Sequence, residues 1–334
     1  MCYEKMISVI ILAHKRTEYI SRALESVLAQ SLDKRNYEVI IVKNFNDPNF
    51  DELAMKCGVI VINSTKGNLG GKIVQGIRAS SGDFIALLED DDEFLPGKLE
   101  KALKEFVQTP DLIYFHNSAK LVSRGEINRK TAMSPPKTMF VQGVVSRKQF
   151  NILIKAGSYG NNSCLTIRKS FVENYLDSLE MLNVTVDGFL FLSALDEGKS
   201  VKFDKSAYTN YHADTGFTYQ KSNNLSDYVS FKFDKTNVML KEKRLFVQIA
   251  NKNFKNRLLL RFSVYSLMKE ILNFNLFSDQ RIYIGLGDIF RYILESLYFG
   301  NIKSLLGFII HLISIKNQKI ATRIEFFIMN LINQ

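Results

Sequence analysis

The sequence predicts an α/β fold with a mostly parallel central sheet flanked by helices, followed by a helical C-terminal region. Through about residue 215, short apolar runs typical of buried strands alternate with helical patterns. Such alternation predicts a parallel sheet that helices cover on both faces. From residue 227 onward, apolar residues recur at helical spacing almost to the end, and the sequence there has no proline. We therefore expect an α/β domain over 1–222 and a helical region over 223–334.

The first elements form a βαβ unit. Residues 7–13 and 37–42 are apolar runs that are too short for helices, and each contains one polar residue. Between them, the apolar residues from Ile20 to Leu28 recur at helical spacing, which predicts a helix with Thr17 as its N-cap. The chain therefore begins with two strands joined by a helix.

The later elements follow from the same patterns. Helices are expected over 51–56, 70–79, 97–107, 168–174 and 186–195, and strands over 59–62, 84–88, 112–115, 164–167 and 201–203. The polar segment 118–138 is expected to form a loop or a weak hairpin. Beyond residue 227 we expect four or five helices, with breaks near 251–253, 273–278 and 300.

Five consecutive carboxylates, Glu89 to Glu93, directly follow the apolar run 84–88. Open α/β sheets bind ligands beyond the carboxyl ends of their strands, so we expect these acids at a ligand-binding edge. Adjacent like charges beside a buried strand need compensation, and Mg²⁺ or Mn²⁺, which prefer carboxylate oxygen, is the simplest. The alternative is a solvated loop before the helix that Pro96 begins.

The segment Asn68-Leu-Gly-Gly-Lys72 lies at the start of the helix expected over 70–79. Its glycines are typical of a turn into that helix, while Lys72 is a candidate contact for a diphosphate or a ribose. The Gly-x4-Gly-Lys-Ser/Thr spacing of a phosphate-binding P-loop is lacking.

The cysteine content and the N-terminal sequence bear on the cellular compartment of the protein. The three cysteines, Cys2, Cys57 and Cys164, lack metal-ligand spacing, which disfavours disulfides and structural zinc and is typical of a reducing compartment. No signal peptide is evident at the N-terminus. We therefore expect a cytoplasmic location, either free or peripheral on the inner face of the cell membrane.

Positive charge is concentrated in the C-terminal region. Residues 241–334 contain 14 Lys and Arg against 6 Asp and Glu, and the whole chain has a net charge of +10. The apolar stretches 289–299 and 305–315 have basic residues near their ends, a pattern typical of helices at an anionic membrane surface. Packing on the α/β domain is the alternative. Zinc-finger spacings and arginine-rich runs are lacking, so nucleic acid is not expected as a partner.

Four segments occur in a fixed order along the chain. They are Arg22-Ala-Leu-Glu-Ser-Val-Leu-Ala-Gln-Ser, Tyr37-Glu-Val-Ile-Ile-Val, Asn68-Leu-Gly, and Ser81-Gly-Asp-Phe-Ile-Ala-Leu-Leu-Glu-Asp-Asp-Asp with Pro96 after it. Together they resemble the family 2 glycosyltransferases of the GT-A fold. The resemblance covers roughly residues 6–215.

The resemblance implies a nucleotide-diphosphate sugar as donor and Mn²⁺ or Mg²⁺ as cofactor. The cation would neutralise charge on the leaving nucleoside diphosphate. The metal ligands implied are Asp90, Asp92 and His212, where a packed histidine without this role is the alternative. The expected donor-binding residues are Ala13, His14, Arg16, Asn44, Lys72, Asp90 and Asp91.

Asp187, in Val184-Thr-Val-Asp-Gly, looks like the acidic residue that begins a late helix in this family and serves as general base. Inversion at the anomeric carbon needs a carboxylate that takes the proton of the acceptor hydroxyl. The alternative is a first-turn Asp without catalytic duty. Competing candidates for the base are Asp177, Glu180 and Asp196.

Two positions depart from the family pattern. Lys43-Asn44 stands where the family usually carries an acidic pair that contacts the base. Asn44 can still hydrogen-bond a base edge, while Lys43 would add positive charge, which allows a base other than uridine. The end of the first strand, Leu12-Ala-His-Lys-Arg16, shares only its arginine with the usual pattern.

We therefore predict an inverting glycosyltransferase that acts on a glycan or lipid-linked glycan in cell-envelope or glycoconjugate synthesis. A sugar-phosphate nucleotidyltransferase is the enzyme alternative, but it would need a Gly-rich loop near the first strand, and residues 12–18 contain no glycine. A membrane-associated scaffold without catalytic activity is the other alternative, motivated by Lys43-Asn44.

Overall fold

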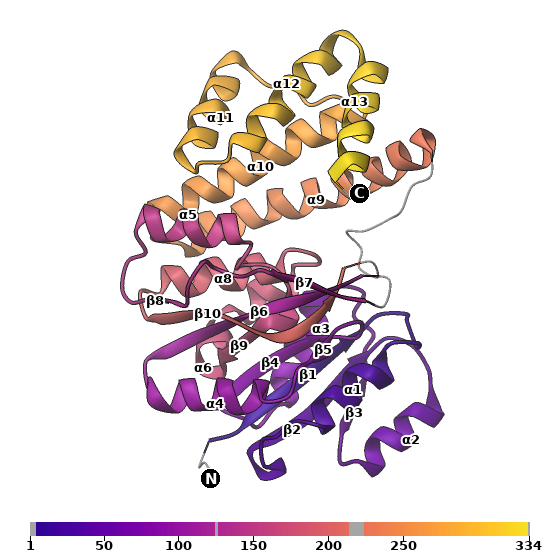
Figure 1. Cartoon of the computed structure of the whole chain (residues 1–334), viewed down its shortest axis with the longest axis vertical. Coiled ribbons are helices and arrows are strands. Elements are labelled where there is room, and N and C mark those ends of the chain that lie inside the picture. The colour runs from indigo at the N-terminus through magenta and orange to yellow at the C-terminus, as the bar shows by residue number, and fades with distance from the viewer. Residues whose placement is uncertain (1–4, 124–125, 214–223, 333–334) are drawn as a thin grey trace. The chain divides into compact units, whose positions relative to one another are not determined.

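The computed structural model of the protein describes residues 5–123, 126–213 and 224–332 (Figure 1). The chain divides into two compact units, Met1–Gly216 and Phe217–Gln334. Within the described residues, the first unit carries the strands and the second is helical. The predicted α/β fold with a helical C-terminal region is therefore confirmed.

In the described part of the first unit, ten strands form one mixed sheet. Their order is β3-β2-β1-β4-β9-β6-β10-β5, with β7 paired to β6 and β8 paired to β10. The strands are β1 (Ile7–Ala13), β2 (Tyr37–Lys43), β3 (Ile60–Asn63), β4 (Phe84–Glu89), β5 (Glu93–Phe94), β6 (Leu112–Ser123), β7 (Glu126–Ala132), β8 (Met139–Val141), β9 (Leu165–Arg168) and β10 (Ser200–His212).

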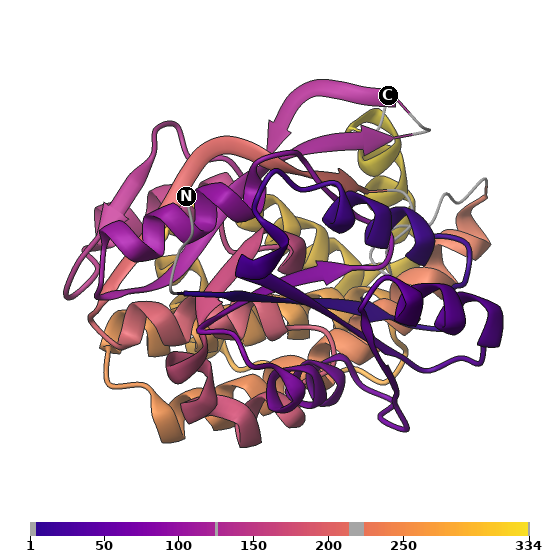
Figure 2. The same cartoon turned by 90° about the horizontal axis from the view of Figure 1, so that it is seen from below.

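Helices connect the strands and lie on both faces of the sheet, as Figure 2 shows from below. They are α1 (Ile20–Leu28), α2 (Pro48–Lys56), α3 (Leu69–Ala79), α4 (Lys98–Gln108), α5 (Arg147–Ala156), α6 (Lys169–Val172), α7 (Leu176–Glu180) and α8 (Val186–Asp196). A 3-10 turn, Asn162–Cys164, leads into β9.

The described sheet is mixed rather than mostly parallel as predicted: it is parallel from β3 to β4 and changes direction at β9. β1 pairs in parallel with β2 and β4, whereas β9 runs antiparallel to both β4 and β6. β10 again runs parallel to β6. The carboxyl end of β4 therefore meets the beginning of β9 at one edge, and the end of β10 reaches the same edge through its contact with Asp92. Distant parts of the chain contribute residues to this edge, which is where α/β sheets bind ligands.

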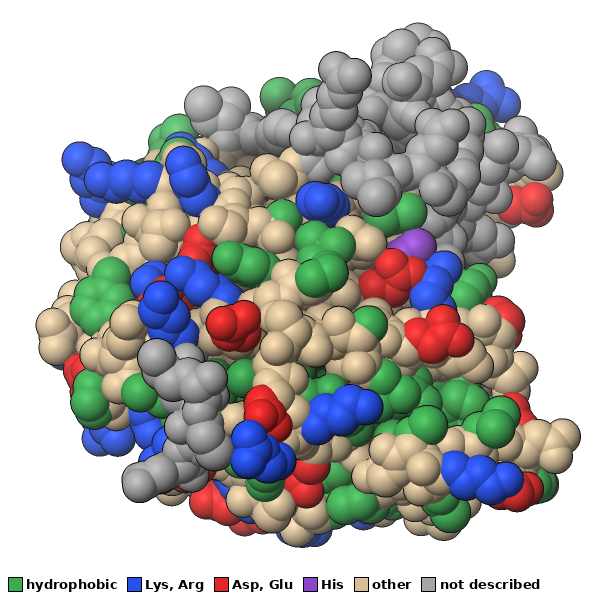
Figure 3. Space-filling view, turned by 60° about the horizontal axis from the view of Figure 1, so that its bottom comes forward, with side chains coloured by type: hydrophobic (Ala, Val, Ile, Leu, Met, Phe, Trp, Pro, Cys, Tyr) green, Lys and Arg blue, Asp and Glu red, His purple; other side chains and the backbone are tan. Residues whose placement is uncertain are grey.

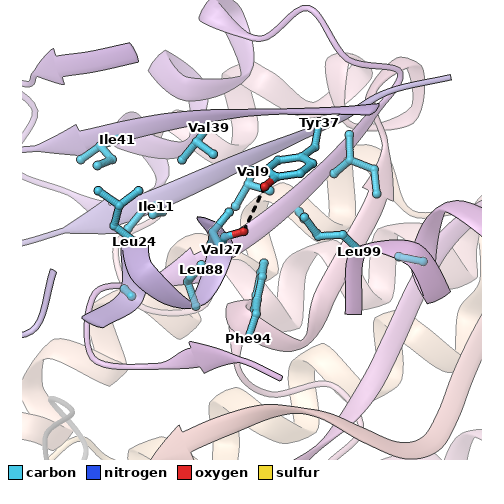
Figure 4. Packing of buried hydrophobic residues seen from close by; sticks show 14 of the residues in the cluster. Val9, Ile11, Leu24, Val27, Tyr37, Val39, Ile41, Leu88, Phe94 and Leu99 are labelled. Atoms are coloured by element: carbon cyan, nitrogen blue, oxygen red, sulfur yellow. Dashed lines mark hydrogen bonds between the residues drawn. The ribbon is translucent and has the colours of Figure 1, made fainter. Parts of the chain in front are cut away.

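Successive side chains of a strand point to opposite faces of the sheet, and the apolar ones pack against helices to form the core. One face of β1 and β2 packs against α1 and α4, and the Tyr37 hydroxyl donates a hydrogen bond of 3.3 Å to the Val27 carbonyl oxygen. On the other face, a Cβ at Gly76 of α3 would come within 2.6 Å of Ile10, so the close helix packing requires glycine. Figure 4 shows the first face with Val9, Ile11, Leu24, Val27, Tyr37, Val39, Ile41, Leu88, Phe94 and Leu99.

Local differences from the prediction have physical reasons. Helix α1 begins at Ile20 with Tyr19 rather than Thr17 as N-cap, and no side chain caps it. Strands β6 and β10 extend well beyond 112–115 and 201–203, because pairing buries polar residues that interrupt the apolar pattern. The hairpin alternative for 118–138 is confirmed by the pairing of β6 with β7. Helix α5 was not predicted.

The second unit consists of five helices in its described residues, in agreement with the prediction. They are α9 (Leu225–Asn253), α10 (Arg257–Phe277), α11 (Leu286–Tyr298), α12 (Ile302–Lys316) and α13 (Gln318–Ile332). Their core includes Tyr228, Leu276, Phe277, Ile310 and Ala321. Among the residues that the structure describes, no helix combines the length and the apolar character needed to cross a bilayer.

Candidate active site

The carboxylates from Glu89 to Glu93 lie at the carboxyl end of β4. β4 ends at Glu89, and Asp90 and Asp91 form the turn that leads to β5. The exposed fractions of Asp90, Asp91 and Asp92 are only 1%, 3% and 1%. Such burial excludes the alternative of a solvated loop, and it requires that other groups compensate the charges.

Basic groups compensate one side of this acidic cluster. The Arg16 guanidinium forms ion pairs with Asp90 and, at 2.8 Å, with Asp91. The backbone N–H of His14 donates to Asp90 Oδ2 at 3.2 Å, and Arg22 donates to the Asp91 carbonyl oxygen at 2.9 Å. The Asp90 side chain is therefore held by the segment that follows β1.

Neutral donors surround the other side. Asp92 accepts hydrogen bonds from Asn161 Nδ2 at 2.9 Å and from the His212 backbone N–H at 3.0 Å. Glu89 accepts one from Asn162 Nδ2 at 2.8 Å. Burial, reinforced by the charge of Asp91, raises the pKa of Asp92 to about 7, and burial likewise raises the pKa of Glu89. These two carboxyls therefore retain protons close to neutral pH.

Glu89, Asp91 and Asp92 form a group that fits a divalent cation. Their ligand oxygens lie within 4.8 Å of one another. Hard cations such as Mg²⁺ and Mn²⁺ prefer carboxylate oxygen, and binding one would release the protons that burial retains. The donor set and its raised pKa values are therefore consistent with a cation site at the end of β4.

The three predicted metal ligands differ in their position relative to this group. Asp92 belongs to the group just described, whereas Asp90 lies outside it and pairs with Arg16, which also pairs with Asp91 of the group. The His212 backbone contacts Asp92, but the His212 ring Nε2 lies 3.7 Å from Glu93 Oε1. The structure thus brings all three predicted ligands to one edge, with Asp90 on its basic side.

A second group of predicted residues gathers beside Asp90. Lys72 Nζ donates to the Ala13 carbonyl oxygen at 3.1 Å and lies 2.8 Å from His14 Nδ1. Asn44 Nδ2 lies 3.0 Å from the same ring nitrogen. Because both neighbours are donors, His14 Nδ1 accepts and the neutral ring carries its hydrogen on Nε2. On the face of the molecule that Figure 3 shows, acidic and basic side chains lie beside one another.

Burial lowers the pKa values of the basic side chains in this second group. It lowers the pKa of Lys72 to about 8, and it lowers the pKa of His14 with help from Lys72. The His14 side chain is nevertheless exposed. Lys72, His14 and Asn44 therefore combine donors with an accessible ring, an arrangement suited to the polar groups of a nucleotide.

Asp187 lies in the first turn of α8, and its side chain is half-buried. Its Oδ2 accepts a hydrogen bond of 2.9 Å from the backbone N–H of Asn161, the residue whose side chain contacts Asp92. The competing candidates lie elsewhere. Asp177 is exposed on α7, Glu180 forms an ion pair of 2.7 Å with Lys66, and Asp196 ends α8.

The model of the family described as Glycosyl transferase family 2 matches residues 8–176, about half of the chain. The chain belongs to this family. The resemblance carried by the sequence motifs is thereby confirmed.

Relatives of this family 2 glycosyltransferase include two bacterial proteins. An uncharacterized glycosyltransferase, YwdF of Bacillus subtilis (strain 168), is 35% identical over 126 residues, which cover 36% of this chain and 45% of that protein. An uncharacterized glycosyltransferase of Haemophilus influenzae is 33% identical over 117 residues, which cover 34% of this chain and 39% of that protein. The chain therefore matches less than half the length of these relatives.

Two solved structures of S. aureus TarS 1-349 share the fold. The complex with UDP-GlcNAc has a TM-score of 0.54 at 16% identity, over 88% of this chain and 80% of that chain. The complex with UDP has a TM-score of 0.52 at 16% identity, over 89% of this chain and 92% of that chain. At this identity the likeness concerns the fold alone.

One departure from the family pattern has a structural explanation. Lys43 is fully buried, its Nζ lies 3.0 Å from Asp51 Oδ1, and it donates to the Phe45 carbonyl oxygen at 2.7 Å. The expectation that Lys43 adds positive charge beside the base is therefore corrected, because Asp51 of α2 balances it. Asn44 lies on the site side instead, next to His14.

Sequence reasoning missed Lys98, the first residue of α4. Its side chain is fully buried, and Nζ donates to Ser163 O at 2.6 Å and to Asn117 Oδ1 at 2.8 Å. Burial lowers the pKa of this amine to about 7. Lys98 thereby joins α4, β6 and the turn before β9 beneath the acidic cluster. A lysine after Pro96-Gly97 carries no sequence signal for burial, since lysines are rarely buried.

Proposed function

We propose that this family 2 glycosyltransferase moves a sugar from a nucleotide-diphosphate sugar to a hydroxyl of a glycan or lipid-linked glycan, with inversion at the anomeric carbon. The observation that carries the proposal is the pair Asp92 and Asp187, held through Asn161 at the ligand-binding edge of the sheet. The nucleotide sugar in one TarS structure of the same fold is consistent with this class of donor.

The donor would bind across the basic side of the cluster. Arg16 and Lys72 offer positive charge, and Asn44 offers an amide to a base or ribose edge. Asp90 fixes Arg16 in place. The backbone of Ala13 positions Lys72 through its carbonyl oxygen. These residues would orient the diphosphate so that the sugar points toward Asp92.

Glu89, Asp91 and Asp92 would hold Mn²⁺ or Mg²⁺. When bound, the cation neutralises negative charge on the departing diphosphate. The predicted ligands Asp90 and His212 would then act around it, Asp90 through Arg16 and His212 through the backbone bond to Asp92.

Asp187 would act as the general base. The acceptor oxygen forms a bond to the anomeric carbon, its proton passes to the Asp187 carboxylate, and the bond from carbon to the diphosphate oxygen breaks. The electron pair of that bond leaves with the nucleoside diphosphate. Attack opposite the leaving group inverts the configuration, and a positioned carboxylate speeds such a step about 10²–10⁴-fold.

The helical unit would place the enzyme on an anionic membrane, where a lipid-linked acceptor resides. Ten exposed large apolar side chains lie between residues 283 and 320 of this unit. We call these side chains, most of them from α11 and α12, the α11–α12 face: Tyr283, Leu286, Phe290, Leu294, Leu297, Leu306, Ile309, Leu312, Ile315 and Ile320. Exposed basic residues of the same segment and of α13 complement an anionic lipid surface: Arg281, Arg291, Lys319 and Arg323.

The experiment that tests the function measures nucleoside diphosphate released from UDP-, GDP- and dTDP-sugars, with water as acceptor and with or without Mn²⁺. We expect release from one donor, dependent on Mn²⁺, with the opposite anomer formed first as seen by NMR. Asp92→Asn should abolish release, whereas Asp177→Asn, which changes an exposed carboxylate, should not.

Two results would overturn the proposal. Pyrophosphate formed from a nucleoside triphosphate and a sugar phosphate would indicate a nucleotidyltransferase. Donor binding without any turnover, with or without added acceptors, would favour a scaffold.

A further inference from the structure

Asn161 has an unusual backbone conformation for its residue type. Its φ and ψ are 69° and 110°, and only Lys15 and Met133 also have positive φ among the described non-glycine residues. Positive φ is uncommon outside glycine and costs conformational energy, so the surrounding structure must hold it. Such conformations cluster at functional sites, and Asn161 lies between the two carboxylates that the proposed function needs.

Three hydrogen bonds use almost every polar group of this residue. The backbone N–H donates to Asp187 Oδ2 at 2.9 Å, and the side-chain Nδ2 donates to Asp92 Oδ2 at 2.9 Å. The side-chain Oδ1 accepts from the Ser163 backbone N–H at 2.6 Å, which fixes the amide orientation. One residue therefore contacts a carboxylate from the end of β4 and another from the start of α8.

The turn that carries Asn161 is anchored in the core. His116 of β6 is fully buried, and its Nε2 donates to the Gly160 carbonyl oxygen at 3.1 Å. On the other side, the Cys164 N–H donates to the Asn161 carbonyl oxygen at 3.1 Å. The positive φ of Asn161 is thus fixed by bonds before and after it, and its two donors keep their directions.

We propose that Asn161 is a positioning residue that sets the spacing and orientation of Asp92 relative to Asp187. The inference rests on the proposed function, because it assigns Asp92 to the cation and Asp187 to the acceptor proton. Asparagine suits both tasks: it tolerates positive φ, and its amide donates to Asp92 while accepting from Ser163. Asp in its place would lack the donor, and Ala would lack the whole amide.

Asn161→Gly separates these contributions. Glycine adopts positive φ without strain, so the N–H bond to Asp187 is retained while the amide bond to Asp92 is lost. We expect kcat to fall and the Mn²⁺ concentration for half-maximal activity to rise, each about tenfold, as for other partners of metal ligands. The KM for donor should change little. Asn161→Ala, strained at this φ, should lose a further part of kcat.

Binding gives a readout that does not depend on turnover. Calorimetric titration with Mn²⁺ alone should show about tenfold weaker binding to Asn161→Gly than to the native protein. Asn174→Gly, which changes an exposed asparagine of the same unit, is the matched control and should bind and turn over normally. The melting temperature of each variant shows whether it folds.

The outcomes separate the two proposals. A native protein that releases nucleoside diphosphate, together with an Asn161→Gly variant of native kcat and native Mn²⁺ affinity, would overturn the role of Asn161 alone. The role would also be overturned if Asn161→Gly and Asn161→Ala lost kcat and Mn²⁺ affinity equally, and only in proportion to a lower melting temperature. A native protein without turnover on any donor would instead overturn the proposed function.

Discussion

The first unit buries charged side chains, and the second unit exposes apolar ones. Asp90, Asp91 and Asp92 are at most 3% exposed, while Leu286 and Phe290 of α11 are 86% and 64% exposed. Each departure from the ordinary sorting of side chains lowers stability unless a ligand or partner compensates. The comparison motivates the ligands that we propose: a cation with a phosphate-bearing donor for the first unit, and an anionic membrane surface for the second.

After the complete loss of release expected for Asp92→Asn, the largest effect is expected at Asp187. Asp187→Asn removes the proton acceptor but keeps an oxygen for the Asn161 N–H, so kcat should fall about 10²–10⁴-fold with little change in donor affinity. Steady-state kinetics with the active donor measure both quantities. If Asp187→Asn keeps more than a tenth of native kcat, Asp187 is not the general base.

The acidic cluster should bind Mn²⁺ more tightly as pH rises. Because the pKa of Asp92 is about 7, a proton competes with the cation at pH 6 and hardly competes at pH 8. The Asp92 proton alone predicts about tenfold tighter binding at pH 8 than at pH 6, and the raised pKa of Glu89 enlarges the difference. Calorimetry in two buffers of different ionisation enthalpy also counts the protons released. An Mn²⁺ affinity that does not change with pH would contradict the raised pKa of Asp92.

The α11–α12 face offers the opposite test, because there the exposed groups are apolar. Replacing Phe290 and Leu294 by serine removes two exposed apolar side chains and should lower partition onto vesicles about tenfold. Sedimentation with phosphatidylglycerol vesicles, compared with phosphatidylcholine, measures this. Leu53→Ser, at a residue 63% exposed in the first unit, is the matched control. If the native protein does not bind anionic vesicles at moderate ionic strength, the proposed membrane contact is wrong.

The smallest effect concerns stability. Folded Asp92 keeps its proton to about pH 7, while the unfolded carboxyl releases it near about pH 3.9. Between these values the native state binds more protons, so the Asp92 contribution lowers stability as pH rises from 5 to 7. Asp92→Asn should therefore melt at a higher temperature relative to native protein at pH 7 than at pH 5. A difference that stays constant with pH would refute this sign.

Sequence patterns predicted the parallel half of the sheet well. β1, β2 and β4 are largely apolar runs, and their ends fall within one residue of those expected. The ends of elements were predicted less well where tertiary packing buries polar residues that interrupt the hydrophobic pattern. In β6, His116 and Asn117 are polar yet fully buried, so the apolar run stops before the strand does. For α5, the signals were a Ser146–Gln149 capping box and Gly157, which periodicity does not detect.

In the candidate site as well, sequence motifs located some residues and not others. Family motifs located Asp92 and Asp187, and the structure places both in contact with one turn. They could not assign a role to Asn161, because that role depends on carboxylates from two other elements and on a positive φ. Nor could they assign Glu89, whose place beside Asp91 and Asp92 follows from the turn after β4.

A thermal-shift screen of UDP-, GDP- and dTDP-sugars, with and without Mn²⁺, tests the central claim most directly. A ligand at about 100 times its Kd adds about 2.7 kcal/mol of stability, which such a screen detects. We predict stabilisation of the native protein by one nucleotide sugar, only with Mn²⁺, and its loss in Asp92→Asn. Stabilisation that survives in Asp92→Asn, or stabilisation by none of the donors, would contradict a cation-dependent donor site at the end of β4.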